Sequence, residues 1–466
     1  MNDRPWRDDQ SQTAGENAAS ERRQGPENPA DDPRASAMFE APMPQAHPTP
    51  PLAATVAQPP GAQSEPLALK GETYWQSVRR RLFKPLLVRF SAAYIIILAL
   101  LAVFVPFIAN GDPYTIVIKA HGKTPAHREY PLFRTLTSID LIVLAVFACL
   151  CCYLVLAWRA GGIADPIARR KSRLRALLIF GGIALIGSLA IYFFHQNVLD
   201  VRNYWRMVKA GRATAAIFPP VHWGYAEMEP LSRNLVYKMP YSRHILGTDG
   251  DGRDVLSRLL WATRIVMAIG FISQVIALVL GVIVGALMGY FVGIVDLIGM
   301  RLVEIFEAIP TFFLILIFVA AYGRSIFMIM IILGLTGWSG IARFIRAEFF
   351  RIRKLDYVTA AIASGLSLPR VLFRHMLPNG VTPVIVSMTF GIAGAVLSES
   401  GLSFLGVGVR PPTPSWGSML NDAGNPGSTF HWYLALAPGI LIFLTVLAYN
   451  LIGESLRDAI DPQLNV

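Results

Sequence analysis

Charged residues are scarce in this chain of 466 residues: they make up 16% of the sequence, whereas an average soluble domain has about 25%. Cysteine is rarer still, with three residues together in one apolar run, at Cys149, Cys151 and Cys152. This excludes a disulfide framework, and the apolar surroundings favour small buried hydrophobic side chains over a redox or metal site. The scarcity of charge argues against a soluble globular protein.

Catalytic and metal-binding motifs are also lacking. A phosphate-binding loop needs G-x-x-x-x-G-K-[ST], so that backbone N–H groups and the lysine cradle phosphates. The nearest match, at Gly122, Lys123 and Thr124, has Val117 in place of the first glycine. Neither H-E-x-x-H nor G-x-S-x-G occurs, and the eight histidines are scattered. We predict that the chain is not an enzyme and holds neither a metal nor a cofactor.

Long apolar runs dominate what is present, since hydrophobic residues make up 53% of the chain. A helix that crosses a hydrocarbon core of ~30 Å needs ~20 such residues. Eight runs qualify, at residues 90–109, 141–158, 177–194, 265–291, 305–322, 326–341, 381–397 and 433–452. The sequence therefore predicts an all-α integral membrane protein with about eight transmembrane helices, in contact with membrane lipid.

The distribution of basic residues predicts the orientation in the membrane. Short loops rich in Lys and Arg stay on the cytoplasmic side. The loop between the second and third runs carries six cations and only Asp165 as an anion; the cations are Arg159, Arg169, Arg170, Lys171, Arg173 and Arg175. Residues 195–264 carry ten basic against six acidic residues, but loops longer than about 60 residues escape the rule. With an even number of spans we expect both termini in the cytoplasm. The net charge of +11 thus reflects topology rather than nucleic-acid binding.

The chain divides into five regions by composition. Residues 1–70 hold 12 of the 32 prolines and few aromatic residues, so we expect a disordered cytoplasmic tail that cannot offset its ordering entropy. A juxtamembrane helix and the first span follow at 71–109. Residues 110–195 form an outer loop and an additional pair of spans, 196–264 an outer loop with an interfacial helix, and 265–466 the main helical core.

Residues 356–379, which we expect to lie in the cytoplasm, are the most informative segment. Ala360 and Ala361 favour a short helix, and Gly365 ends it because glycine tolerates positive φ. Pro369 then opens a second helix that Pro378 closes. The small side chains allow close approach by another protein, so the segment suits docking into a groove of a partner. An ordinary amphipathic interfacial loop is the alternative.

In its spacing this segment resembles the cytoplasmic coupling loop, or EAA loop, of permease subunits in binding-protein-dependent ABC importers. Ala360, Ala361, Gly365, Leu377 and Pro378 carry the resemblance, and His375 and Asn379 narrow it to the dipeptide and oligopeptide group. Thr359 departs from the family, which usually has glutamate there. The resemblance implies that the loop contacts the ATPase subunits, with Asp356 and Tyr357 among the contacting residues.

Three further segments resemble the same group. Residues 244–265 match its outer-face motif before the second conserved span, at Gly247, Thr248, Asp249, Gly252, Arg253 and Asp254. The sequence G-T-D-G-D-G predicts a turn, and Asp254 can cap the helix that follows. Residues 397–420 resemble the loop between the last two spans, and 453–463 the cytoplasmic end. Residues 217–230 resemble the branch that takes up microcin-C-like peptides, which does not fix a substrate.

The resemblance implies a permease subunit of a peptide importer in the inner membrane. Its partners would be a second homologous permease, two cytoplasmic ATPases and an extracytoplasmic peptide-binding protein. Glu399 is the best candidate to line the path. The additional pair of spans is not typical of the group, and lipid-facing packing is favoured for it because it has few polar residues. An ion-coupled secondary transporter is the main alternative, but no convincing internal repeat supports it. A signalling or scaffold protein is a third.

Overall fold

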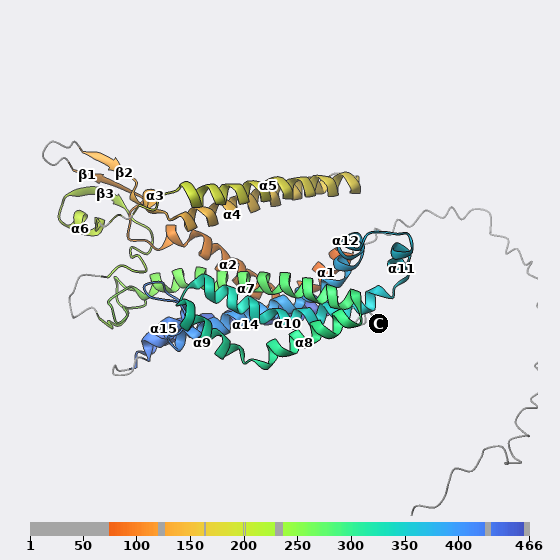
Figure 1. The fold of residues 1–466 in the computed structure, drawn as a ribbon. Helices are drawn as coiled ribbons and strands as arrows, with labels where there is room; N and C mark the ends of the chain where they lie inside the picture. The colour runs from red at the N-terminus through yellow and green to blue at the C-terminus, as the bar shows by residue number, and fades with distance from the viewer. Residues whose placement is uncertain are drawn as a thin grey trace, which may run out of the picture. The chain divides into compact units, whose positions relative to one another are not determined.

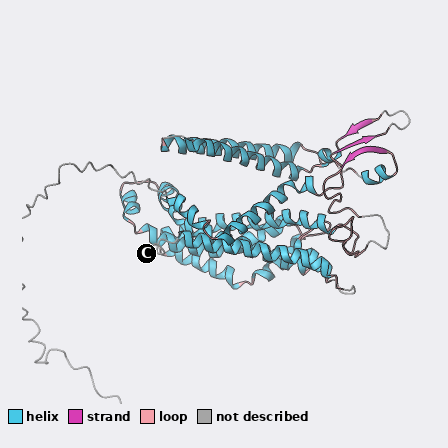
Figure 2. Ribbon diagram, turned by 180° about the vertical axis from the view of Figure 1, so that it is seen from behind, coloured by secondary structure: helices cyan, strands magenta, loops and turns pink. Residues whose placement is uncertain are grey.

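The computed structural model describes residues 74–119, 126–162, 165–198, 200, 202–228, 236–424 and 430–460; the predicted tail lies outside them. Figures 1 and 2 show mostly helices and one small sheet in this part of the chain. Seven described helices are long and apolar enough to cross a membrane, and one bent pair brings the number to eight. They are α2 (Leu86–Ile108), α4 (Ser138–Arg159), α5 (Pro166–Phe194), α7 (Val255–Phe291), α10 (Ile326–Arg353), α14 (Thr382–Phe404) and α16 (Trp432–Ile460), with the pair α8 (Ile294–Ala308) and α9 (Thr311–Tyr322). The predicted all-α membrane class is confirmed.

Helices α7 and α10 pack side by side along much of their length (Figure 1). Glycines at four-residue spacing on α7 let the two backbones meet. A Cβ atom added at Gly281 would lie 2.7 Å from the Cβ of Ile341, and one added at Gly285 would lie 2.8 Å from that of Ile345. Small residues give helices this close contact in lipid, where no hydrophobic force drives association. Because residue numbers rise together along the contact, the two helices run parallel.

A return crossing makes this parallel arrangement possible. Helices α8 and α9 are bent by 78° relative to one another, and Pro310 stands at the break, where it lacks an N–H group for a continuous helix. The predicted single run at 305–322 is therefore divided. The Nη2 atom of Arg346 on α10 lies 2.7 Å from the Asp296 carboxylate, so an ion pair holds α8 against α10.

Helix α7 differs from the sequence prediction at its start. An interfacial helix ending at residue 264 and a separate span from 265 were expected, but α7 is one continuous helix of 37 residues. Two arginines, Arg258 and Arg264, interrupt its apolar course. Both are paired with aspartates, Arg258 with Asp249 in the turn before α7 and Arg264 with Asp140, 124 positions away. Nothing in the local sequence breaks the helix there.

The last two spans and the first complete the main bundle. Helix α14 packs against α7 and α16, and α2 packs against the same two helices. The hydroxyl of Tyr94 on α2 lies 3.0 Å from that of Thr445 on α16. Helix α1 (Tyr74–Leu82) precedes α2 and contacts α16, where the Ser455 hydroxyl donates to the Leu82 carbonyl over 3.1 Å.

The additional pair, α4 and α5, forms a hairpin closed by the short 3-10 helix η2 (Ala160–Gly162). Thr137 and Asp140 form a capping box at the start of α4. At the same end, Asp140 pairs with Arg264 on α7, and the Ser138 amide donates to Asn197 over 2.8 Å. No residue in the apolar window of α5 is buried by the described chain. The hairpin is thus attached mainly at one end.

A small antiparallel sheet stands at that end, and it was not predicted from the sequence. Its order is β2 (His127–Glu129), β1 (Thr115–Ile118), β3 (Ala213–Ile217), with α3 (Pro131–Thr135) and α6 (Tyr204–Lys209) beside it (Figure 2). Hydrogen bonds from the Arg202 guanidinium, one of 2.7 Å, hold the pKa of the Asp200 carboxyl well below its usual range. Arg202 also lies 3.0 Å from Glu129, so it ties β2 to the segment before α6.

Candidate functional site

The predicted coupling segment begins with α11 (Asp356–Ala363), which follows directly from α10. Its inward face is formed by Val358, 0% exposed, and Ala361, 7% exposed. Val358 packs in one apolar cluster with Ile352 and Met376. Its outward residues are Asp356, Tyr357, Thr359, Ala360, Ile362 and Ala363. The expectation that Ala361 lies on the docking surface is therefore wrong: it seats the helix on the protein's own core, while Ala360 is exposed.

Gly365 ends α11 in the way the sequence predicts. Its φ is +72°, in the region that favours glycine. Its N–H donates to the Ile362 carbonyl over 2.9 Å, and the Leu366 N–H donates to the Ala361 carbonyl over 3.3 Å. These two bonds are those of a Schellman motif. They turn the chain toward the second part of the loop.

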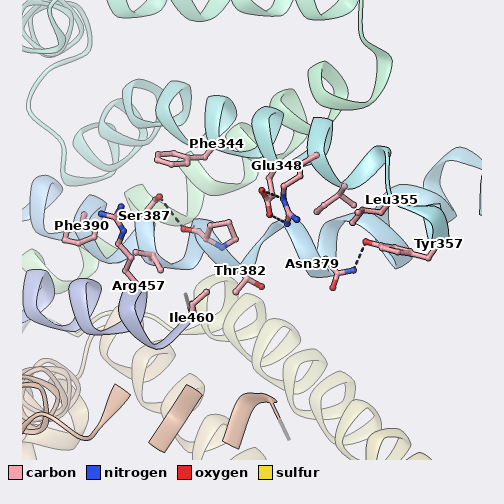
Figure 3. Close-up of a pocket in the computed structure, with 14 residues that line it drawn as sticks. Phe344, Glu348, Leu355, Tyr357, Asn379, Thr382, Ser387, Phe390, Arg457 and Ile460 are labelled. Atoms are coloured by element: carbon pink, nitrogen blue, oxygen red, sulfur yellow. Dashed lines mark hydrogen bonds and ion pairs between the residues drawn. The ribbon is translucent and has the colours of Figure 1, made fainter. Parts of the chain in front are cut away.

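That second part departs from the expected helix closed by Pro378. It runs from α12 (Leu368–Arg370) through the π-helix η4 (Val371–Met376) into α13 (Leu377–Gly380). Pro378 has no N–H for the Arg374 carbonyl, so the wider π turn absorbs the missing bond and the chain continues. Asn379 donates from Nδ2 to the Tyr357 hydroxyl over 3.1 Å (Figure 3). The same Nδ2 donates to the His375 carbonyl over 3.0 Å. Three of the predicted residues are thereby brought together.

A cavity of about 1170 Å³ opens beside the loop. Figure 3 shows its lining from the ends of α10, α14 and α16 and from Tyr357 of α11. Glu348 and Arg351 on α10 pair within it at 2.6 Å. Arg457 of α16 has no ion pair with any described residue. The cavity is thus apolar in most of its wall, with one uncompensated cation.

The outer-face motif directly precedes Val255, the first residue of α7, at the opposite end of the bundle from the coupling segment. Asp249 accepts hydrogen bonds from the Arg253 backbone N–H over 2.8 Å and from its Nε over 2.9 Å, and also pairs with Arg258. Gly247 and Gly252 have positive φ, +81° and +75°. The predicted turn is therefore present, built around one buried carboxylate.

Asp254 caps α7, as the sequence predicts. Its Oδ2 accepts from the Ser257 N–H over 2.7 Å, and its Oδ1 lies 2.7 Å from Nδ1 of His244. The His244 ring stacks on Trp223, 4.7 Å between centroids. Thr248 is buried, and its carbonyl accepts from the Tyr433 hydroxyl over 3.2 Å. Neither Trp223 nor Tyr433 was predicted from the sequence. Tyr433 lies 185 positions from Thr248, so no local signal pointed to it.

The helix α15 (Trp416–Ala423), between the last two spans, adds a further carboxylate to the ion cluster of Asp249, Arg253 and Arg258. Asp422 lies 3.4 Å from Arg258. Burial raises the pKa of the Asp422 carboxyl, and Arg258 opposes that shift. The charges of the two arginines and of the carboxylates thus compensate one another. The ion pairs of this cluster hold the start of α7 to the outer loops.

Glu399 lies on α14 and is completely buried within the chain. Its Oε1 accepts from the Ser403 hydroxyl over 2.6 Å, and that hydroxyl accepts from the Val409 N–H over 3.2 Å. A side chain without exposed surface lines no path in this conformation. What Glu399 does here is hold the end of α14 to the following turn.

No group of three or more His, Cys, Asp or Glu residues that would hold a metal occurs among the described residues. Residues 122–124, the nearest match to a phosphate loop, lie outside them. The arrangement instead links an exposed helix at one end of α10 to a rigid ion cluster at the opposite end of α7.

Comparison with known proteins gives consistent matches. Residues 281–466 match the family described as binding-protein-dependent transport system inner membrane component, and residues 73–125 match the N-terminal TM domain of oligopeptide transport permease C.

The oligopeptide transport system permease protein OppC of Haemophilus influenzae is 32% identical over 63% of this chain and 86% of its own length. The dipeptide permease DppC of Bacillus subtilis is 36% identical over 48% and 70%. The glutathione permease GsiD of Pectobacterium atrosepticum is 37% identical over 48% and 74%. Among solved structures, an inward-facing MetNI methionine ABC transporter aligns with a TM-score of 0.34 and 18% identity, over 44% of this chain and 97% of the other.

Proposed function

We propose, from the premise that this chain belongs to the family of inner membrane components of binding-protein-dependent transport systems, that it is the permease subunit of a peptide-importing ABC transporter. The substrate class is supported by relatives that are named as oligopeptide and dipeptide permeases. The observation that carries the proposal is the exposed outer face of α11, seated on the core by its buried face.

The partners follow from this role. A second homologous permease would complete the path, two cytoplasmic ATPases would hydrolyse ATP, and an extracytoplasmic peptide-binding protein would deliver the substrate. We place the chain in the inner membrane with both termini in the cytoplasm, because eight crossings return the chain to its starting side and the most basic short loops lie on the side of α11.

Force would pass from α11 to the outer face through close-packed contacts. Val358 joins α11 to the end of α10 in one apolar cluster. The glycine contacts join α10 to α7, and Asp254 and Asp249 fix the start of α7 to the outer turn. Packed interiors transmit displacement because they are dense and poorly compressible. Closure of the ATPases would therefore rock this block between outward-open and inward-open states.

The test is assembly and coupled hydrolysis in the reconstituted complex. Ala360→Trp adds bulk on the exposed face of α11, and we expect loss of ATPase copurification with normal membrane insertion. Ala190→Trp, at an exposed position of α5, is the matched control and should leave assembly unchanged. Retention of stoichiometric ATPases by Ala360→Trp would contradict the docking role. Peptide uptake driven by an ion gradient without ATP would favour the secondary transporter instead.

A further inference from the structure

The end of the α4–α5 hairpin that lies on the coupling-loop side is strongly basic. Asp165 is the single acidic residue between positions 159 and 175, and its carboxylate caps α5 by accepting from the Ile167 N–H over 2.9 Å. The basic residues end α4 and fill the first three turns of α5. We call them the basic collar: Arg159, Arg169, Arg170, Lys171, Arg173 and Arg175.

The five cations on α5 gain no stabilisation from that helix. Positive charge in the first turn of a helix is opposed by the helix dipole, which acts on Arg169, and the dipole gives nothing to the four cations beyond that turn. Arg170, Lys171, Arg173 and Arg175 are exposed and form no ion pair with any described residue. Their charge is therefore not neutralised by any described residue and is available to an external anion.

Helix lengths place the collar at the membrane surface. Helix α5 has 29 residues and is about 44 Å long, which exceeds a hydrocarbon core of about 30 Å by the length of about nine residues. Its outer end is fixed by the attachment of α4 to α7 through Asp140 and Arg264. The excess is thus at the start of α5, in the first turns that carry the cations. Trp158, 82% exposed, lies beside them, at the depth where aromatic residues gather.

The exposed surface of the hairpin suits lipid better than a protein groove. Three consecutive residues of α5, Leu177, Leu178 and Ile179, are 50%, 67% and 58% exposed. Consecutive helical residues point about 100° apart, so the uncovered surface is wide rather than one stripe. A partner helix would cover a stripe and would need polar or close-packed contacts for specificity.

We propose that the basic collar binds the phosphate groups of anionic phospholipids in the leaflet on the coupling-loop side. The exposed guanidinium and ammonium groups match the charge of the lipid phosphates, and the apolar hairpin beyond them accommodates the acyl chains. The site does not depend on which substrate the protein carries. It requires only that the hairpin lies in the membrane.

The test uses the full chain in nanodiscs of phosphatidylcholine with a minority of phosphatidylglycerol. Spin-labelled analogues of both lipids report the association constant of one relative to the other. For Arg170→Gln with Lys171→Gln we expect about a fivefold loss of preference for phosphatidylglycerol. Each cation near an anionic surface raises the affinity about fivefold, and the cations that remain keep the total loss below the product of two such factors. Arg170→Lys with Lys171→Arg should keep the preference.

The matched control is Arg128→Gln with Arg206→Gln, which removes two exposed cations from the outer region and should leave the preference unchanged. An equal loss in this control would show a general charge effect and overturn the site. An unchanged preference in the collar variant would do the same. Displacement of the lipid signal by millimolar glycerol phosphate would assign the collar to a soluble anion instead. Peptide-stimulated ATP hydrolysis, measured in parallel, tests the transport function separately.

Discussion

The Schellman turn at Gly365 offers a graded test of coupling. Its φ of +72° costs a residue with a Cβ about 1–2 kcal/mol. No atom lies within 4 Å of an added Cβ, so Gly365→Ala brings strain without a clash. A penalty of this size lowers the population of the correct turn by about 5- to 30-fold. Gly365→Pro goes further, because it fixes φ near −65° and removes the N–H that donates to Ile362.

We expect Gly365→Ala to weaken, and Gly365→Pro to abolish, the ATP hydrolysis that a loaded binding protein stimulates. The assay is hydrolysis and peptide uptake in proteoliposomes, with subunit stoichiometry measured alongside. Insertion should be normal, since the turn lies outside every candidate span. The misplaced part is α11, whose seat on the core tolerates little displacement because dispersion contacts fade over sub-ångström gaps.

Gly406 is a matched control for backbone strain. It has φ of +76°, open space around an added Cβ, and the same pair of Schellman hydrogen bonds at the end of α14. Gly406→Ala therefore carries the same local penalty on the outer side. Stimulated hydrolysis should survive it. Normal coupling in Gly365→Pro, or equal losses in both alanine variants, would refute the coupling role of the loop.

Three further predictions concern topology, attachment and packing. In a cysteine-free background, Arg170→Cys should be labelled from the cytoplasm and Ala226→Cys from the opposite side; labelling of both from one side would remove the eight-span topology. Arg264→Gln leaves the buried Asp140 carboxylate without its ion pair, at a cost of about 3–5 kcal/mol, and should expose the α4–α5 hairpin to limited proteolysis while the ATPases stay bound. Gly285→Val should lower thermal stability in detergent by separating α7 from α10, whereas Gly340→Val, where an added Cβ meets nothing, should not.

Local signals in the sequence predicted the spans and two turns. Long apolar runs locate the crossings because the bilayer sets their length, and Asp254 and Gly365 act through the backbone next to them. The inward position of Ala361 was also readable: it lies three residues after Val358, on the same helical face. The expectation failed because a small side chain was taken as a sign of docking.

Long-range pairing explains what the sequence did not reveal. The sheet joins strands of three to five residues, and β1 and β3 stand some 95 positions apart, so no short window contains the pairing. The ion pair of Arg264 with Asp140 joins residues 124 positions apart, so the sequence around α7 does not reveal the partner of this arginine within one continuous helix. Pro378 itself can be read from the sequence, but not whether the helix ends there or continues through a π turn.

The one-ended attachment of the α4–α5 hairpin makes it a lever. Helix α5 is about 44 Å long and is held near its outer end through Asp140 and Arg264. A tilt of about 5° in α7 would therefore sweep the free end through about 4 Å, the product of that angle and a length taken from the helical rise. A pair of distance probes, one at the free end and one on α11, would magnify a rocking motion that is small at its pivot. The same leverage means that whatever holds the free end in the membrane adds a load to each transport cycle.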